Sequence, residues 1–277
     1  MTVLPRKLGL VDATAIVIGD VVGTAIFLVP NSVAQNLSSA AMILAVWIVT
    51  GVLSFFGALA YAELGAMIPS TGGQYVFLRD SYGPLWGFLC GWSFILAIYS
   101  GANATLAVGF ATYLSYFIHL TPLLFKLAAV ALVAILTLVN YRGVELGAAT
   151  QRFFTLLSVS GLVAIIGSAL LSRQSTAIEW SLPASGFPWS RFGVAMIACL
   201  WAYEGWSSVS FVAGEIKEPQ RNLPLSLGLG VATIVALYVL ANVAYLKILP
   251  ISTIASTERV AATMAERTIG PLGASLV

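Results

Sequence analysis

The chain has 277 residues, of which 59% are hydrophobic and only 9% charged, and its net charge is +2. Soluble proteins carry about 25% charged residues, so this composition indicates an integral membrane protein. The near balance of 13 basic and 11 acidic residues excludes a nucleic-acid-binding surface. One histidine, with two cysteines inside apolar segments, excludes an ordinary zinc site, and we expect no metal, no cofactor and no disulfide.

The first apolar segment, residues 10–35, is long enough to cross a bilayer, which takes about 20 apolar residues. It contains Asp20 and, shortly after it, Gly23-Thr24-Ala25. A carboxylate and small residues at this depth indicate surrounding protein or water, because lipid cannot satisfy polar groups. If the helix unwinds here, the freed N–H groups form a site for a small carboxylate. Glycine at this depth also fits simple close packing of helices.

Six further spans are expected downstream, separated by polar connectors such as residues 141–152. The expected spans are residues 40–65, 84–117, 123–140, 153–171, 191–212 and 224–249. Residues 172–190 are typical of an extracellular loop, and residues 257–268 predict a short amphipathic surface helix. Residues 270–277 begin another apolar stretch, so we expect a polypeptide cut at the start of an eighth span.

The sixth expected span repeats the features of the first. In Trp201-Ala202-Tyr203-Glu204-Gly205-Trp206 an acid, a glycine and aromatic rings lie in the middle of an apolar segment. Two interrupted helices in corresponding positions of two halves are the best sequence indication of a transporter's binding site.

The short loops indicate the orientation of the chain. Seven of the 13 basic residues fall on the side of the N-terminus, namely Arg6, Lys7, Arg79, Arg142, Arg152, Lys217 and Arg221. This bias favours a cytoplasmic N-terminus in a multi-pass protein of the plasma or inner membrane. Glu63, Arg79, Glu215 and Lys217 near these ends form either an inner gate of ion pairs or ordinary solvated loop faces.

Four motifs, in this order, carry a resemblance to a known family. They are Gly23-Thr24-Ala25-Ile26-Phe27, Tyr61-Ala62-Glu63-Leu64-Gly65, Pro69-Ser70-Thr71-Gly72-Gly73 and Ala202-Tyr203-Glu204-Gly205-Trp206. With them the chain resembles the amino acid-polyamine-organocation (APC) transporters, closest to their L-type amino acid transporter branch. The resemblance implies an all-α integral membrane fold of two inverted five-helix repeats with discontinuous helices 1 and 6. Residues 1–171 would form the first repeat and residues 191–277 part of the second.

The resemblance also implies a substrate site. The amides of Gly23, Thr24 and Ala25 would hold the substrate carboxylate, while the carbonyls of Val21 and Val22, with those near Ala202, would receive its ammonium group. Trp201 stands where the family has a gating aromatic residue, and it would close over the substrate or simply pack in a helix interface. The expected binding residues are Val21, Val22, Gly23, Thr24, Ala25, Ile26, Trp201, Ala202, Glu204 and Gly205.

Three residues bear on energy coupling. A charged Glu204 inside the membrane is disfavoured by about 2.5–3.5 kcal/mol on insertion scales, so it is a candidate proton carrier or cation selector. Alternatively, Glu204 is a structural acid that is hydrogen-bonded to neighbouring backbone. The same two alternatives apply to Asp20. Many family members have a lysine in helix five where this chain has Ser158. A serine cannot supply that charge, so coupling to H⁺, Na⁺ or a counter-substrate stays open.

The family's eukaryotic members bind a heavy subunit through a cysteine in the loop after helix three. Residues 117–122 contain no cysteine, so no disulfide-linked heavy subunit is expected.

The sequence therefore favours a secondary active transporter that moves amino acids across the cytoplasmic membrane by alternating access. A carrier of polyamines or other organocations with the same fold, or a non-functional fragment of such a carrier, are the alternatives. A channel or receptor is disfavoured because the chain has no repeated filter motif and no large extramembrane domain. An intramembrane enzyme would need paired catalytic groups, for which Asp20 and Glu204 are the available residue types, but we expect no enzyme.

Overall fold

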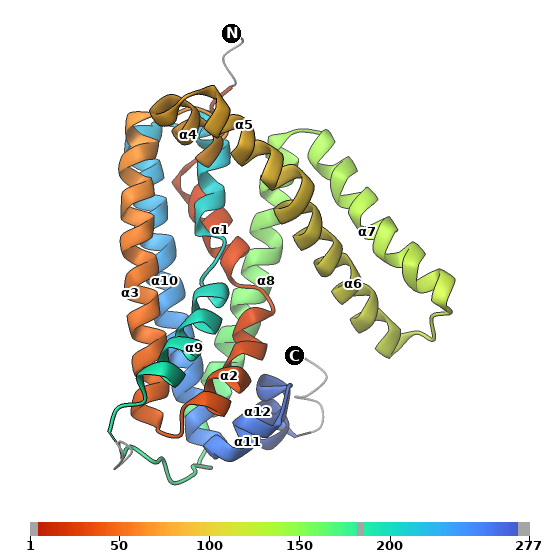
Figure 1. The fold of residues 1–277 in the computed structure, drawn as a ribbon. Helices are drawn as coiled ribbons and strands as arrows, with labels where there is room; N and C mark the ends of the chain where they lie inside the picture. Colours follow the sequence, from red (N-terminus) through yellow and green to blue (C-terminus); the bar gives the residue numbers. More distant parts are fainter. Residues whose placement is uncertain (1–4, 182–185, 271–277) are drawn as a thin grey trace.

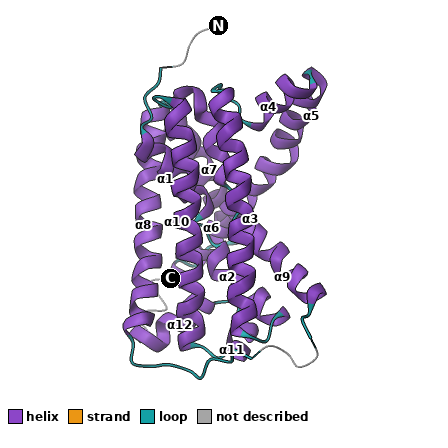
Figure 2. Cartoon of the chain, turned by 90° about the vertical axis from the view of Figure 1, so that its left-hand side faces the viewer, coloured by secondary structure: helices purple, strands orange, loops and turns teal. Residues whose placement is uncertain are grey.

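The computed structural model describes residues 5–181 and 186–270, and within these ranges the regular elements are helices (Figures 1 and 2). In chain order they are α1 (Leu10–Val21), α2 (Ala25–Asn36), α3 (Ala40–Met67), α4 (Gln74–Tyr82), α5 (Pro84–Ser93), the π-helical η1 (Phe94–Ile98), α6 (Tyr99–Phe117), α7 (Pro122–Tyr141), α8 (Val144–Leu171), α9 (Trp189–Ala202), the 3-10 helix η2 (Trp206–Glu215), α10 (Pro219–Ile248), α11 (Ile251–Ser256) and α12 (Val260–Ile269). The all-helical class predicted from the sequence is confirmed.

Five helical stretches of the described chain are long and apolar enough to cross a membrane. They are Ala40–Met67, Pro84–Thr112, Pro122–Tyr141, Glu145–Leu171 and Pro219–Ile248. α1 and α2 together form a sixth candidate, bent by 44° where they meet. The sixth expected span, predicted to be discontinuous, corresponds to α9, which ends at Ala202 after 14 residues, and to η2, which follows a break. The expected helix at residues 191–212 is therefore interrupted at the second of the two predicted positions.

The core of the bundle lies where α3, α10 and α1 pack together, with α1 between α10 and α8 (Figure 2). Buried residues recur every three or four positions along α3: Ile43, Val46, Trp47, Thr50, Ser54, Ala58, Ala62 and Gly65. A Cβ at Gly51 would lie 2.8 Å from the Val235 side chain of α10. Small residues thus allow α3 and α10 to approach closely.

The long helix expected over residues 84–117 contains a π-helical turn. η1 joins α5 to α6, and the Ser100 hydroxyl donates a hydrogen bond to the carbonyl of Ile95, five residues back. A π-bulge holds one extra residue in a turn without ending the helix, so the span continues through it. α6 and α7 form a hairpin that leaves the bundle at an angle, with most of its apolar side chains exposed (Figure 1).

The helix boundary predicted at residue 153 was wrong, because α8 already begins at Val144 and absorbs most of the expected polar connector. Two ion pairs to the N-terminal region accommodate its charged residues. Lys7 Nζ lies 3.0 Å from Glu145 Oε1, and Arg152 Nη1 lies 2.8 Å from Asp12 Oδ1. Periodicity alone did not reveal this helical start because the partners lie more than 130 residues away in sequence.

α10 also begins earlier than the expected residue 224, at Pro219. Proline suits the first position of a helix, where its missing N–H leaves no bond unmade. Near the other end of the chain, α12 lies close to the expected residues 257–268, but it buries Val260, Ala261 and Met264 against the bundle. The stretch at residues 271–277, expected to begin a further span, lies outside the described residues.

The segment before α1 is tied to the end of η2 by main-chain hydrogen bonds. The N–H groups of Lys7 and Leu8 donate to the Glu215 carbonyl at 2.9 and 3.0 Å, and the Lys217 N–H donates to the Leu8 carbonyl at 2.8 Å. Leu8 and Ile216 thereby form a parallel β-bridge. The first and second broken helices are thus joined at one end of the bundle.

At the opposite end, Lys247 of α10 caps the C-terminus of α8. Its Nζ donates to the carbonyls of Ala169, Leu170 and Ser172 at 3.1, 2.6 and 2.9 Å. These are carbonyls that a helix end leaves without intrahelical partners. A cation there also interacts favourably with the helix dipole.

We predict that Lys247→Met lowers the stability of the purified protein by about 2 kcal/mol, because charge-assisted hydrogen bonds are lost while the aliphatic stem is kept. Thermal unfolding in detergent measures the change. Lys126→Met, on the exposed face of α7, is the control and should leave the transition temperature unchanged. Equal shifts for the two variants would contradict the capping role.

Candidate functional site

The first helix break lies between Val21, where α1 ends, and Ala25, where α2 begins. The Gly23 N–H donates to the Val21 carbonyl at 2.8 Å, which closes a tight turn around Val22. The first N–H groups of any helix lack intrahelical partners, so α2 presents free donors at this turn. Gly23 and Thr24 are exposed, whereas the side chains of Ala25 and Ile26 are buried.

The second break follows Ala202, the last residue of α9. Tyr203 has φ −90° and ψ 1°, and Gly205 has φ 121°. This φ lies in the left-handed region that favours glycine. The Glu204 N–H still donates to the Trp201 carbonyl at 3.2 Å, and the chain then enters η2.

The two breaks lie against each other. A Cβ added at Gly205 would lie 2.7 Å from the carbonyl oxygen of Asp20, at the end of α1. Glycine is therefore required at this position for two reasons, its backbone conformation and the close approach of α1. The residues expected from two distant segments of the sequence come together at this contact.

Two carboxyl groups flank the contact. Asp20 and Glu204 are both exposed, and Ser208 lies near Asp20. Tyr99 of α6 lies within electrostatic range of both acids, and Tyr61 of α3 within range of Glu204. The junction thus combines exposed carboxylates with tyrosine hydroxyls from neighbouring helices.

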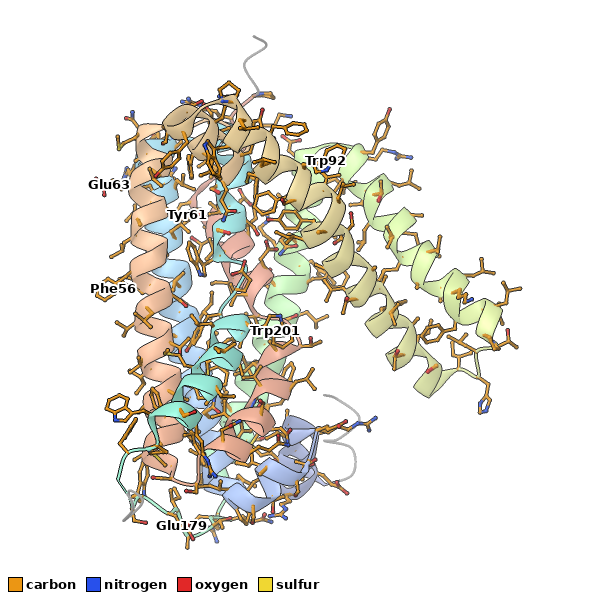
Figure 3. All side chains as sticks on the ribbon, in the orientation of Figure 1. Phe56, Tyr61, Glu63, Trp92, Glu179 and Trp201 are labelled. Atoms are coloured by element: carbon orange, nitrogen blue, oxygen red, sulfur yellow. The ribbon has the colours of Figure 1, made fainter. Side chains whose placement is uncertain are left out.

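Trp201, the expected gating residue, is 59% exposed and projects from the end of α9 at mid-height of the bundle (Figure 3). Val22 and Ala202 are buried, so they offer the site only main-chain groups. The Val21 carbonyl already accepts two hydrogen bonds, from Gly23 N–H and from the Tyr238 hydroxyl at 2.7 Å. The Val21 carbonyl and the Gly23 amide, both expected to face a ligand, are thus engaged within the protein.

Ser158 lies on α8, which runs parallel to α1. Lys7 pairs with Glu145, Asp12 with Arg152, and the Thr155 hydroxyl donates to the Ala15 carbonyl at 3.1 Å. Continuing this register by three residues puts Ser158 level with Ile18, about one turn before the first break. The Ser158 side chain is exposed.

A buried aromatic cluster supports both breaks from behind, and the sequence analysis missed it. Trp47 of α3, Tyr203 and Tyr238 of α10 are fully buried, with ring centroids 5.2 to 5.8 Å apart. The Tyr203 hydroxyl donates to the Trp47 carbonyl at 3.2 Å. A buried tyrosine usually needs a hydrogen-bond partner. Tyrosines inside apolar segments are therefore the sequence feature from which this cluster could have been predicted.

Of the two alternatives for Glu63, Arg79, Glu215 and Lys217, solvated loop faces are favoured, because no ion pair of the described residues joins any two of them. Arg79 pairs with its neighbour Asp80 at 2.8 Å, and Glu63 points away from the bundle (Figure 3). Between η2 and the helices facing it the structure has aromatic contacts instead. The ring pairs are Tyr61 with Trp206 at 5.2 Å, Tyr99 with Phe211 at 5.8 Å and Phe94 with Phe211 at 5.8 Å.

These features define a multi-pass membrane protein with a polar junction at two adjacent helix breaks. Residues 8–277 match the family described as amino acid permease, so the chain belongs to the amino acid permease family. The family is one of permeases, which separates the chain from the intramembrane enzymes considered above.

Three relatives resemble the chain over nearly its whole length. The b(0,+)-type amino acid transporter 1 of Homo sapiens is 31% identical over 98% of this chain and 57% of its own length. The large neutral amino acids transporter small subunit 2 of Mus musculus is 33% identical, over 96% and 52%. The cystine/glutamate transporter of Pongo abelii is 32% identical, over 96% and 55%. The chain therefore spans little more than half the length of these relatives.

We predict that Gly205→Ala destabilises the protein by about 1–3 kcal/mol, because alanine is strained at this φ and its Cβ overlaps the Asp20 carbonyl. Gly193→Ala, in α9 where a Cβ meets open space, is the matched control. It should be neutral or slightly stabilising, because alanine favours helix. Thermal unfolding of both variants tests the prediction, and similar transition temperatures would refute it.

Proposed function

We propose that the protein is a secondary transporter of amino acids, with the substrate held at the junction of the two helix breaks. The contact between Gly205 and the Asp20 backbone carries this proposal, because it brings free main-chain donors and two exposed carboxylates to one position. A zwitterionic amino acid needs hydrogen-bond donors for its carboxylate and negatively charged groups for its ammonium. Membership in the amino acid permease family and the names of the relatives support an amino acid as the substrate.

The substrate carboxylate would bind at the start of α2. Because the Gly23 amide is engaged with Val21, the donors assigned to the carboxylate are the N–H groups of Thr24, Ala25 and Ile26. The positive end of the α2 dipole favours an anion at the same point. The lack of intrahelical acceptors for these amides follows from helix geometry.

The substrate ammonium group would bind on the opposite side of the junction. The carbonyls of Val22 and Ala202 are its expected partners, since the Val21 carbonyl is occupied by Gly23 and Tyr238. Asp20 adds a negative charge beside them. Trp201, which is largely exposed, would close over the bound substrate as a gate.

The substrate side chain would lie near Glu204. An exposed carboxylate at the second break favours a cationic side chain, so we assign Glu204 as a cation selector. Glu204 and Asp20 are also the candidates for proton coupling. Ser158 supplies no fixed positive charge near the break. Transport could therefore be coupled to H⁺, to Na⁺ or to a counter-substrate, which uptake at different pH values and sodium concentrations distinguishes.

The N-terminus is proposed to face the cytoplasm, in line with the basic residues at that end. The connection between α6 and α7 contains no cysteine, and we propose that the protein has no heavy subunit disulfide-linked at this position.

A polyamine or other organocation is the second candidate substrate, favoured by the paired acids Asp20 and Glu204. The two candidates differ in one requirement. An amino acid needs the amide donors of α2 for its carboxylate, whereas a polyamine has no carboxylate and would leave them unused.

Replacing Thr24 by proline tests the carboxylate site. Thr24 has φ −68°, which proline adopts, so Thr24→Pro removes one N–H donor with little backbone strain. We expect substrate affinity of the full-length protein in liposomes to fall about tenfold, as for a lost hydrogen bond to a charged group. Thr24→Ala keeps the amide and should behave like wild type. Equal losses in both variants would assign the effect to the hydroxyl instead.

Replacing Glu204 by glutamine tests substrate choice and coupling. We expect uptake of lysine and arginine to fall about tenfold while leucine uptake is retained, because only the cationic side chain loses a charged partner. Uptake at two pH values, with and without sodium, identifies the coupling ion. Glu63→Gln, on the outer face of α3, is the control. Unchanged lysine uptake in Glu204→Gln would contradict the assignment, and putrescine uptake unaffected by Thr24→Pro would favour the polyamine carrier.

A further inference from the structure

A groove on the outside of the bundle runs between α1 and α8, away from the helix breaks. It has a volume of about 400 Å³, and Leu229 of α10 also lines it. Its α1 wall extends from Leu10 to Ile18, about 12 Å at 1.5 Å per residue. Val11 and Leu156 on its rims are 72% and 67% exposed. The groove is therefore an open apolar slot on a membrane-spanning surface.

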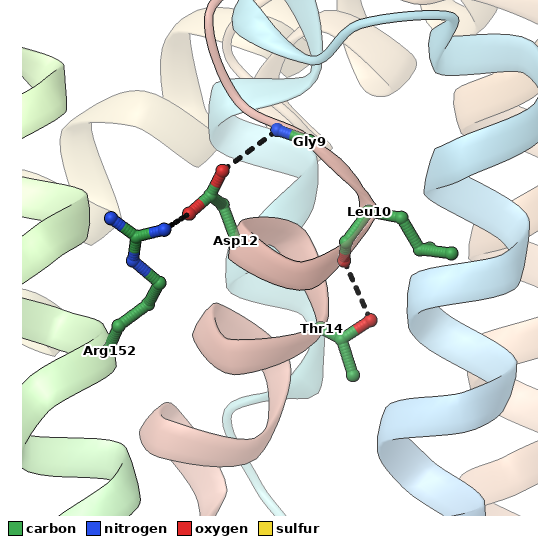
Figure 4. Close-up of polar contacts among 5 residues, drawn as sticks. All are labelled: Gly9, Leu10, Asp12, Thr14 and Arg152. Carbon is green, nitrogen blue, oxygen red and sulfur yellow. Dashed lines mark hydrogen bonds and ion pairs between the residues drawn. The ribbon is translucent and has the colours of Figure 1, made fainter.

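The polar side chains on the walls of this groove are satisfied within the protein. The Thr14 hydroxyl donates to the Leu10 carbonyl at 2.8 Å (Figure 4), and the Thr155 hydroxyl donates to the Ala15 carbonyl at 3.1 Å. Both threonines thus offer the groove little more than carbon surface. Such walls suit a hydrocarbon chain and provide no partners for a polar ligand.

A guanidinium group lies at the end of the groove nearest the N-terminus. Arg152 Nη1 contacts Asp12 Oδ1 at 2.8 Å, and Asp12 Oδ2 accepts the Gly9 N–H at 2.9 Å (Figure 4). Arginine has five N–H donors, and the contact with Asp12 uses only one nitrogen. The Arg152 side chain is 45% exposed, so its remaining donors face outward at the head of the apolar slot.

We propose that this groove binds one membrane glycerophospholipid, with an acyl chain against α1 and α8 and its phosphate on the free side of Arg152. The groove matches a phospholipid in polarity and charge, because its apolar walls suit the acyl chain and Arg152 at its end suits the phosphate. Arginine suits this role because its planar fork pairs with two phosphate oxygens. Lys7 and Glu145 pair at the same end but do not line the groove, whereas Arg152 is its charged lining residue.

Native mass spectrometry of the full-length protein tests this proposal. The protein is purified from nanodiscs of phosphatidylcholine, phosphatidylglycerol and cholesterol, and we expect one retained phospholipid per chain. Ala15→Phe fills the groove and Arg152→Gln removes the phosphate partner, so each should reduce retention about tenfold. Ala164→Phe, elsewhere on α8, and Arg142→Gln, just before α8, are the matched controls and should retain the lipid.

Asp12→Asn separates headgroup binding from the pairing of α1 with α8. It breaks the same ion pair as Arg152→Gln but leaves the guanidinium, so it should retain the phospholipid at wild-type level or above. Equal loss in both variants would overturn the proposal, because the groove would then depend on the ion pair alone. Retention of cholesterol only, a mass of two chains without lipid, or no adduct in the wild type would overturn it as well.

Discussion

The structure depends on how main-chain polar groups are satisfied where two membrane helices break. The Val21 carbonyl at the end of α1 is one such group, and it accepts both the Tyr238 hydroxyl and the Gly23 amide. Behind the second break, the Tyr203 hydroxyl bonds to the Trp47 carbonyl of α3. Breaks inside a bilayer persist only where protein supplies such partners. The buried ring cluster therefore belongs to the site as much as the exposed acids do.

Helix α1 faces two different environments. One side of α1 meets Gly205 at the break junction, and another side forms the wall of the groove that ends at Arg152. α1 is only 12 residues long, and its outer face is held to α8 by the Asp12–Arg152 ion pair. The proposed substrate and the proposed lipid would therefore contact different sides of α1.

The sequence predicted the elements whose signals are local. The segments around Gly23 and Glu204-Gly205, taken together, predicted a break in each helix, and the family resemblance implied that the two breaks meet. The start of α8 at Val144 was missed because Glu145 and Arg152 look like a loop until their partners in the N-terminal region are known. Tyr238 was missed for a similar reason, since its role depends on a carbonyl 217 positions away. The roles of Asp20 and Glu204 stay predictions, because proximity alone does not identify a ligand.

The β-bridge between Leu8 and Ile216 has a mechanical consequence. Three main-chain hydrogen bonds couple the beginning of α1 to the end of η2. Because these bonds join the two segments, a tilt of α1 relative to η2 would have to break them. The turns at residues 22–24 and 203–205 separate these joined segments from α2 and α9, so the two breaks share one main-chain connection.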